Sequence, residues 1–381
     1  MFESIFIGLS GMRAFSTGLK QISNNITNIN STGFKSSGIA FTDLFGAGSA
    51  HGGQGVALQA PRIDFAQGEL RQSERDLDLA VDGGGFMVLL KDAETFFART
   101  GSFEVNDDGD IVLAGTDYKL TVLDASGRAT AVSVAAHRTH PPQQTTTVTF
   151  ADNLSSSATS YNLANIQVYD AQGVAEMWSA RFERDANAAP GEWTVIVTKT
   201  DGTEVGRETL KFIGGIVDPI TSRLQFSSAS RTVEFDFSKN VTSFSSGEVS
   251  TLRVSAADGY AAGEITSITV NDEGRIEIRY SNEQKTELGA VTLASFDNPQ
   301  SLEQRGNGLF AHDARSGVEF LTSAHNKVGR VLSGRLEASN VELADQFGDL
   351  ILVQRGFQAS SQVVSVSNDM IQQLFGIRGQ G

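Results

Sequence analysis

The chain has 381 residues, 40% of them hydrophobic and 20% charged, so it is long enough to bury the cores of two or three domains. Its formal net charge of −15 argues against nucleic acid and anionic lipid as partners, because both require a basic face. It has no cysteine, which excludes disulfides and thiolate chemistry, and its 39 glycines against 6 prolines indicate a β-rich body with many turns.

A long amphipathic helix is predicted near the N-terminus, over about residues 3–28. Two ladders of apolar residues, each with a spacing of seven, form a stripe along one face of this helix. The ladders consist of Ile5, Met12, Leu19 and Ile26, and of Phe15, Ile22 and Ile29. Asn28 or Asn30, together with Gly33, are predicted to cap its C-terminal end, because Asn and Gly tolerate the left-handed conformation.

This N-terminal stretch has neither a cleavable signal peptide nor a membrane span. The first charge is Glu3, the first basic residue is Arg13, and no long apolar region follows. The longest apolar runs, such as "IFIGL" and "FMVLL", fall far short of the roughly 20 residues needed to cross a bilayer. We therefore expect a chain that stays in the cytoplasm or is exported without cleavage of its N-terminus.

The glycine-rich stretch "FGAGSAHGGQG", residues 45–55, has the composition of a loop. A phosphate-binding loop would require a following G-K-[ST] and a strand–loop–helix frame, and the sequence offers neither. We therefore expect a connecting loop without a ligand.

From about residue 76 the pattern changes to strands. "DLDLAVDGGGFMVLL" and the hairpins "FEVNDDGDIVL" and "SITVNDEGRIEIRY" show alternating apolar residues around turns. Residues 150–252 form a separate β unit by the same criterion, with strands in "IQVYDAQG", "MWSARFERD", "WTVIVTKTDG" and "VEFDFS". The acidic turns lack the bidentate Glu of a calcium loop and are interpreted as solvated turns.

No catalytic constellation is visible in the sequence, and no cofactor site is predicted. The five histidines are scattered, and no serine lies in a G-x-S-x-G turn. His137 and His140 have a spacing that suits a shared metal, but no third ligand is nearby, so we assign them to a linker. The chain is predicted not to be an enzyme.

A second long helix is predicted at the C-terminus, over about residues 341–376. Its apolar ladder runs without a break at a spacing of seven, with shorter accompanying ladders. The ladders contain Leu336, Leu343, Leu350, Phe357, Val364 and Ile371, with Val353 and Leu374, and with Phe347. Ser339 and Asn340 are predicted to cap its start, and Glu342 places negative charge near the first turn.

Two interpretations of these helices remain open from the pattern alone. They are either ordinary amphipathic helices on a globular core, or helices whose apolar faces pack against each other and against other copies of the chain. The second is favoured because residues 14–34 carry a single charge, Lys20, and offer Ser, Thr, Asn and Gln on their outer face.

Four segments resemble the rod and hook family of flagellar axial proteins, over about residues 1–90 and 275–381. They are "GLSGMRAFSTGLKQISNNITNINSTGFKSSGIAFTDLF", "DLDLAVDGGGFMVL", "YSNEQKTELGAVTLASFDNPQSLEQRGNGLF" and "LEASNVELADQFGDLILVQRGFQASSQVV". The inserted unit at 150–252 favours the hook branch of the family, and a distal rod or hook-associated axial component is the alternative. A secreted enzyme or carbohydrate-binding β protein with coiled-coil ends is a third hypothesis.

The resemblance implies mainly β globular domains, nested and discontinuous, with α-helical coiled-coil N- and C-terminal segments. We assign residues 1–30 plus 341–381 to a helical inner-tube domain and 31–75 plus 326–340 to a connecting region. Residues 76–149 plus 253–325 are assigned to a β domain, and 150–252 to an inserted outer β domain.

The implied function is that of a subunit that polymerises with itself into a flexible tube carrying torque from rod to filament. The implied partners are copies of the chain, the rod, the hook cap, the hook–filament junction proteins and the type III export apparatus, and the implied location is extracellular. Neither nucleic acid binding nor membrane insertion is expected. The assembly residues would be the ladder residues of the two helices.

Overall fold

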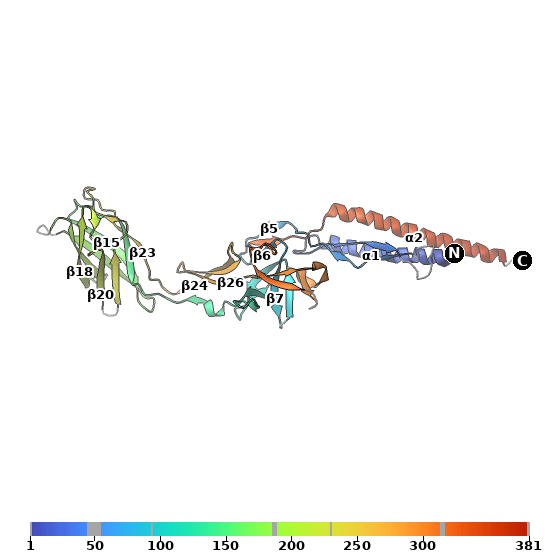
Figure 1. The fold of residues 1–381 in the computed structure, drawn as a ribbon, viewed down its shortest axis with the longest axis horizontal. Helices are drawn as coiled ribbons and strands as arrows, with labels where there is room; N and C mark the ends of the chain where they lie inside the picture. The colour runs from blue at the N-terminus through green and yellow to red at the C-terminus, as the bar shows by residue number, and fades with distance from the viewer. Residues whose placement is uncertain are drawn as a thin grey trace. The chain divides into compact units, whose positions relative to one another are not determined.

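The computed structural model describes residues 2–43, 55–92, 94–184, 189–228, 231–312 and 317–378. It is mainly β, with two long α-helices, α1 (Phe2–Thr27) and α2 (Leu343–Arg378) (Figure 1). Both predicted helices are confirmed to within about two residues at each end. Nearly all of the glycine-rich loop expected at 45–55 lies outside the described residues.

The chain separates into two compact units. Unit 1 consists of Met1–Ala136, Ser267–Ile278 and Thr286–Gly381, and unit 2 consists of His137–Thr266 and Arg279–Lys285. Among the described residues, no helix combines the length and the apolar character needed to cross a membrane.

Unit 1 contains both helices and a large twisted sheet with the strand order β28-β29-β8-β7-β11-β10-β9-β6-β31. β12 extends it beside β11, and β27 pairs with both β7 and β30. The strands are β6 (Asp78–Asp82), β7 (Phe86–Lys91), β8 (Glu94–Ala98), β9 (Thr100–Val105), β10 (Ile111–Leu113), β11 (Lys119–Leu123), β12 (Ala129–Ala131), β27 (Thr292–Phe296), β28 (Leu302–Gln304), β29 (Leu309–His312), β30 (Val318–Thr322) and β31 (Arg330–Ser333).

Three short antiparallel pairs lie in the segments that connect the helices to this sheet. They are β1 (Ser37–Gly38) with β4 (Arg62–Ile63), β2 (Phe41–Asp43) with β3 (Val56–Leu58), and β5 (Leu70–Gln72) with β32 (Arg335–Glu337). The 31–75 stretch, in which the sequence shows little periodicity, therefore contains ordered strand pairs.

Unit 2 is built on a sheet with the order β15-β16-β17-β18-β19-β22-β14-β21-β20, and β23 pairs with β14. Its strands are β14 (Thr147–Asn153), β15 (Ser160–Tyr169), β16 (Ala175–Glu183), β17 (Glu192–Lys199), β18 (Glu204–Ile213), β19 (Ile216–Val217), β20 (Arg223–Ser228), β21 (Arg231–Asp236), β22 (Val241–Thr242) and β23 (Arg253–Ala257). All four strands predicted by alternation in this region are confirmed.

The core of unit 2 is rich in large aromatic side chains. Both tryptophans of the chain, Trp178 and Trp193, are buried in it, and Phe150 stacks on Phe237 with a centroid distance of 4.4 Å. Because each buried aromatic side chain removes a large apolar area from water, this core contributes strongly to the stability of unit 2.

A four-stranded sheet, ordered β13-β24-β25-β26, contains the second predicted hairpin. Its strands are β13 (Thr139–His140), β24 (Gly263–Val270), β25 (Arg275–Tyr280) and β26 (Lys285–Ala290). The first predicted hairpin is β9–β10, in which the Asn106 side chain accepts a hydrogen bond from the backbone N–H of Asp110 across the turn. Short 3₁₀ helices lie at Ala135–His137, Pro299–Ser301 and Gly306–Gly308.

Candidate functional site: the paired helices and their base

The two helices lie side by side and antiparallel, and they meet through small residues (Figure 1). A Cβ atom added to Gly8 would lie 2.7 Å from Val364 Cγ2, and one added to Gly11 would lie 2.6 Å from Ser360 Oγ. Farther along, Gly18 faces Val353. The absence of side chains on α1 at these positions lets the backbones approach closely, as at other helix pairs with small residues at the contact.

Two of the predicted ladder residues belong to this contact within the chain. The Phe15 ring lies over Gly356, where an added Cβ would come within 2.4 Å of it, and also packs on Phe41 at 5.1 Å. Ile22 is 1% exposed. The Asn25 side chain completes the contact by donating to Gln346 Oε1 at 2.9 Å.

Most large apolar side chains of the helices point elsewhere and stay exposed. The residues with exposed fractions between 37% and 68% are Phe6, Ile7, Leu9 and Leu19 on α1, and Leu343, Phe347, Ile351, Leu352, Phe357, Val363, Val366 and Met370 on α2. An apolar surface of this extent indicates a site of protein–protein contact.

The predicted assembly residues therefore fall into three groups. Leu19, Leu343, Phe347 and Phe357 are exposed. Ile5, Met12, Phe15, Ile26, Ile29, Leu350, Val364 and Ile371 are partly buried, and Ile22 is buried. The side chain of Leu374 lies outside the described residues. Their contact with other copies, and a heptad-based coiled coil, stay predictions.

A groove of about 690 Å³ runs along α1, between this helix and β3. Phe6, Leu9 and Arg13 line it from the helix, and Val56 and Leu58 line it from the strand. Its walls are mainly apolar, with one cationic side chain.

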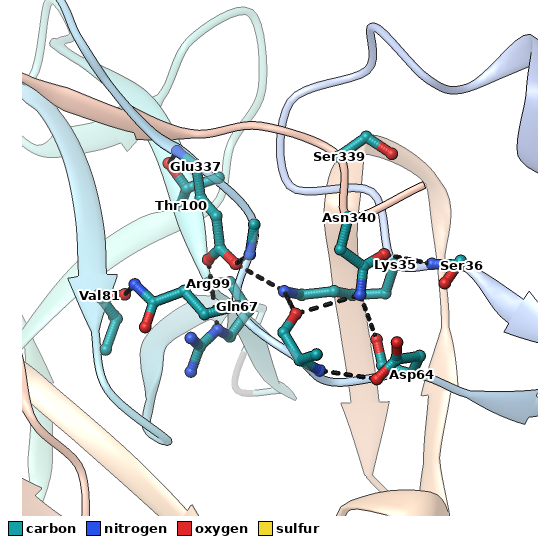
Figure 2. A network of polar contacts seen from close by, with 12 residues as sticks. Lys35, Ser36, Asp64, Gln67, Val81, Arg99, Thr100, Glu337, Ser339 and Asn340 are labelled. Atoms are coloured by element: carbon teal, nitrogen blue, oxygen red, sulfur yellow. Dashed lines mark hydrogen bonds and ion pairs between the residues drawn. The ribbon is translucent and has the colours of Figure 1, made fainter. Parts of the chain in front are cut away.

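At the base of the helix pair, three charged side chains are buried together (Figure 2). Lys35 and Glu337 have side chains that are 0% exposed, and that of Arg99 is 2% exposed. Lys35 Nζ lies 2.6 Å from Glu337 Oε1, and Arg99 Nε lies 3.4 Å from Glu337 Oε2. The backbone N–H of Gly68 donates to Glu337 Oε1 at 2.8 Å, so the carboxylate joins three separate segments of unit 1.

A backbone carbonyl group accepts a further hydrogen bond from each of the two cations. Lys35 Nζ donates to the carbonyl oxygen of Ala66 at 2.7 Å, and Arg99 Nη1 donates to that of Gly85 at 2.6 Å. The Arg99 guanidinium also lies 5.4 Å from the centroid of the Phe86 ring. Such hydrogen bonding is the condition under which buried charges are tolerated.

Burial dominates the electrostatics of both cations. It lowers the pKa of Lys35 below its ordinary value of 10.5, and Glu337 opposes this shift through its charge and its hydrogen bond. Burial likewise lowers the pKa of Arg99, again against the opposing effect of Glu337. The cluster is therefore held by one carboxylate shared between two cations.

The predicted cap of α2 at Asn340 is wrong. Its side-chain oxygen accepts a hydrogen bond from the backbone N–H of Ser36, and its amide nitrogen donates to the carbonyl oxygens of Asp64 and Ala66 (Figure 2). Tertiary contacts have replaced the local cap, and Asn340 instead ties the start of α2 to the segment that follows α1. The end of α1 is closed partly as predicted, because the Asn28 side chain donates to the carbonyl oxygen of Asn24 and Gly33 adopts a φ of +69°.

The contacts of this cluster position the two helices relative to the sheet of unit 1. Within the described ranges, no three His, Asp or Glu side chains gather closely enough to hold a metal ion. His140 of the predicted linker packs between the rings of Tyr260 and Tyr280, at 5.3 and 5.1 Å.

Comparison with known proteins gives two matches to family models. Residues 332–377 match the model described as the flagellar basal body rod FlgEFG protein C-terminal, a range that contains β32 and all but the last residue of α2. Residues 137–308 match the flagellar basal body protein FlaE D2 domain, whose first matched residue is also the first residue of unit 2.

Similar full-length proteins are flagellar hook proteins. The chain is 29% identical to the flagellar hook protein FlgE of Salmonella typhimurium, over 97% of this chain and 98% of that protein. It is 26% identical to FlgE of Treponema pallidum, over 99% of this chain and 100% of that protein. Among solved structures, Helicobacter pylori flagellar hook protein FlgE2 matches 71% of this chain and 100% of its own, with 12% identity and a TM-score of 0.48.

Proposed function

We propose that this chain, which belongs to the rod and hook family of flagellar axial proteins, is a structural subunit of the bacterial flagellar hook. It assembles with copies of itself into a flexible curved tube that transmits torque from the rod to the filament. The similarity to hook proteins over nearly the whole length of both chains supports the hook over the rod.

The observation that carries self-assembly is the set of large apolar side chains left exposed on both helices. Fully burying one such side chain is worth about 1.5–3 kcal/mol, so several of them contacting neighbouring copies would hold a polymer together. The small-residue contact between α1 and α2 uses few of them, which leaves both outer flanks available to other copies.

In this proposal the helices, residues 1–30 and 341–381, form the inner tube. The β domain of residues 76–149 and 253–325 and the inserted domain of residues 150–252 form outer layers, with 31–75 and 326–340 as connections. The outer layers slide against their neighbours while the helical tube holds, so bending needs only small shear between subunits.

The proposed partners follow from the family. They are other copies of the chain, the rod, the hook cap and the hook–filament junction proteins. The subunit would pass through the type III export apparatus without cleavage of a signal peptide and would reside in the extracellular hook. A distal rod or hook-associated axial component is the second candidate, and straight tubes rather than curved ones would favour it.

Electron microscopy of the concentrated full-length chain tests the proposal. We expect short curved tubes from the natural chain and none from a variant in which Phe347, Leu352 and Phe357 are replaced by serine. Ile220→Ser is the matched control, because Ile220 is 89% exposed but belongs to unit 2 and not to either helix. A natural chain that stays monomeric under all salting-out conditions, with protease-resistant helices, would contradict the proposal.

A further inference from the structure

The helix α2 extends beyond its partner in the same chain. Gly8 of α1 lies opposite Val364 and Gly18 lies opposite Val353, so the first residue of α1 lies near position 370 of α2. The eight residues from Ile371 to Arg378 therefore continue past the end of α1 by about 12 Å, at 1.5 Å per residue (Figure 1). A helical end without a packing partner is marginal in water, so this stretch requires a partner from outside the chain.

The two turns of α2 that precede the overhanging stretch present an apolar stripe with one carboxylate. Val363, Val366 and Met370 are 44%, 51% and 47% exposed and are spaced by three and four residues, which places them on one side of the helix. Asp369 is exposed next to this stripe. The other two acidic residues of α2, Asp345 and Asp349, instead line a polar hollow at the base of the helix pair.

The groove along α1 has the complementary character. Phe6 and Leu9 are 68% and 37% exposed, and the apolar residues Val56 and Leu58 form the opposite wall. Arg13 is the cation among the lining residues, and in the described part of the chain its guanidinium has no ion pair. The groove thus fits an apolar helix face that carries one carboxylate.

We propose that the groove along α1 receives the C-terminal part of α2 from a second copy of this chain. Val366 and Met370 of that copy pack against Phe6 and Leu9, and Asp369 pairs with Arg13. This inference rests on the proposed self-assembly and specifies one of its contacts.

The contact is heterologous, because one copy supplies the groove and the other the helix end. After two copies bind, one of them still has a free groove and the other a free helix end. Further copies can bind at these two surfaces, so the contact does not stop at a dimer. The charge pair lies at an exposed position and acts mainly in selecting the correct register, while the apolar side chains supply most of the affinity.

Charge reversal tests the pairing. Arg13→Asp and Asp369→Arg should each raise the critical concentration for polymerisation about tenfold, which corresponds to about 1.4 kcal/mol. The double variant should return to within about threefold of the natural chain, because the swapped charges attract again. Lys20→Asp is the matched control: Lys20 is an exposed cation on α1 that does not line the groove, so its reversal should have a clearly smaller effect.

A mixing experiment protects the test against variants that merely fold poorly. Arg13→Asp and Asp369→Arg chains, each impaired alone, should co-assemble, since each offers the surface that the other lacks. Single variants that polymerise as readily as Lys20→Asp, or a mixture and a double variant as impaired as the singles, would overturn the pairing. The proposed function would stand in that case, because it fails only if the natural chain itself forms no tubes.

Discussion

The core of unit 2 and the helix pair of unit 1 use the same kinds of apolar residue in opposite ways. Phe237 in unit 2 is fully buried between aromatic neighbours, whereas Phe6 on α1 is 68% exposed. The first arrangement is complete within one chain. The second relies largely on glycine and serine at its contact and leaves many large apolar side chains exposed. In the proposed function, stability and assembly are thus assigned to different regions of the molecule.

Matched phenylalanine substitutions test this division most strongly. Phe237→Ala should lower the free energy of unfolding of unit 2 by about 3–5 kcal/mol, because it removes a buried ring from a close-packed core. Phe6→Ala should change the stability of the monomer by less than about 0.5 kcal/mol, as surface substitutions do, but should impair polymerisation. Both tryptophans of the chain lie in unit 2, so their fluorescence during urea unfolding reports on that unit.

An equal loss of monomer stability in the two variants would show that Phe6 already packs within its own chain. The comparison between the two regions would then be wrong. Normal polymerisation of Phe6→Ala would leave the comparison intact but would remove Phe6 from the assembly surface.

Removing the shared carboxylate at the helix base should have the next largest effect. Glu337→Gln leaves Lys35 and Arg99 buried without a counter-charge, and we expect the helix-bearing unit to lose about 3 kcal/mol of stability. Circular dichroism at 222 nm during urea unfolding measures the helices, while tryptophan fluorescence should show unit 2 unchanged.

Glu319→Gln is the matched control for that substitution. Glu319 pairs with Lys327 at 2.7 Å, but both side chains are more than half exposed, so its loss should have little measurable effect. Equal effects of the two substitutions would mean that the buried cluster contributes no more than a surface ion pair.

Two glycine substitutions distinguish the contact face of the helices from their outer face. Gly8→Val should destabilise the helix pair by about 1–3 kcal/mol through overpacking against Val364 and Ser360. Gly348→Ala should instead stabilise α2 by up to about 1 kcal/mol, because an added Cβ meets nothing within 4 Å and alanine favours the helix. Thermal unfolding followed at 222 nm measures both, and a stabilising Gly8→Val would contradict the observed contact.

The helices and most strands could be predicted from the sequence because their signals are local and periodic. The ladders of seven predicted α1 and α2, and alternation predicted the strands of residues 150–252. Packing of the two helices against each other was expected, and Phe15 and Ile22 of the ladders lie in that contact. The glycines that bring the backbones together could not be predicted in this way. Gly8, Gly11 and Gly18 carry no hydrophobic signal and are recognised only once the backbones are seen side by side.

The buried cluster was missed for a different reason. Glu337 is 238 positions from Arg99 and 302 from Lys35, and no local pattern connects such distant residues. Arg335 and Glu337 fall on the same face of β32 by alternation, yet the first is exposed and the second buried. The error at Asn340 has the same origin, since a residue suited to a local cap found stronger partners in distant segments.

The smallest predicted effect is the pH dependence of the buried cluster. Because burial lowers the pKa of Lys35, the unfolded chain binds this proton more tightly than the folded chain does. Stability rises with pH wherever the unfolded state holds more protons, so the penalty for the buried ammonium is full only below the pKa of Lys35 in the folded chain. It should decrease as the pH rises from the folded-state pKa toward 10.5, the ordinary value.

Urea unfolding of the helix-bearing unit, followed at 222 nm from pH 7 upward, measures this dependence against Lys35→Met. The natural chain should gain stability relative to the variant as the pH approaches 10.5, because only the natural chain can relieve the penalty by releasing the Lys35 proton. Lys327 is exposed, and its ion pair with Glu319 raises its pKa instead of lowering it. The Lys327→Met variant should therefore keep the rise in stability toward pH 10.5. If stability depends on pH equally in the natural chain and in Lys35→Met, burial of the Lys35 ammonium costs no free energy. Glu337 would then compensate fully for the lost hydration of the ammonium.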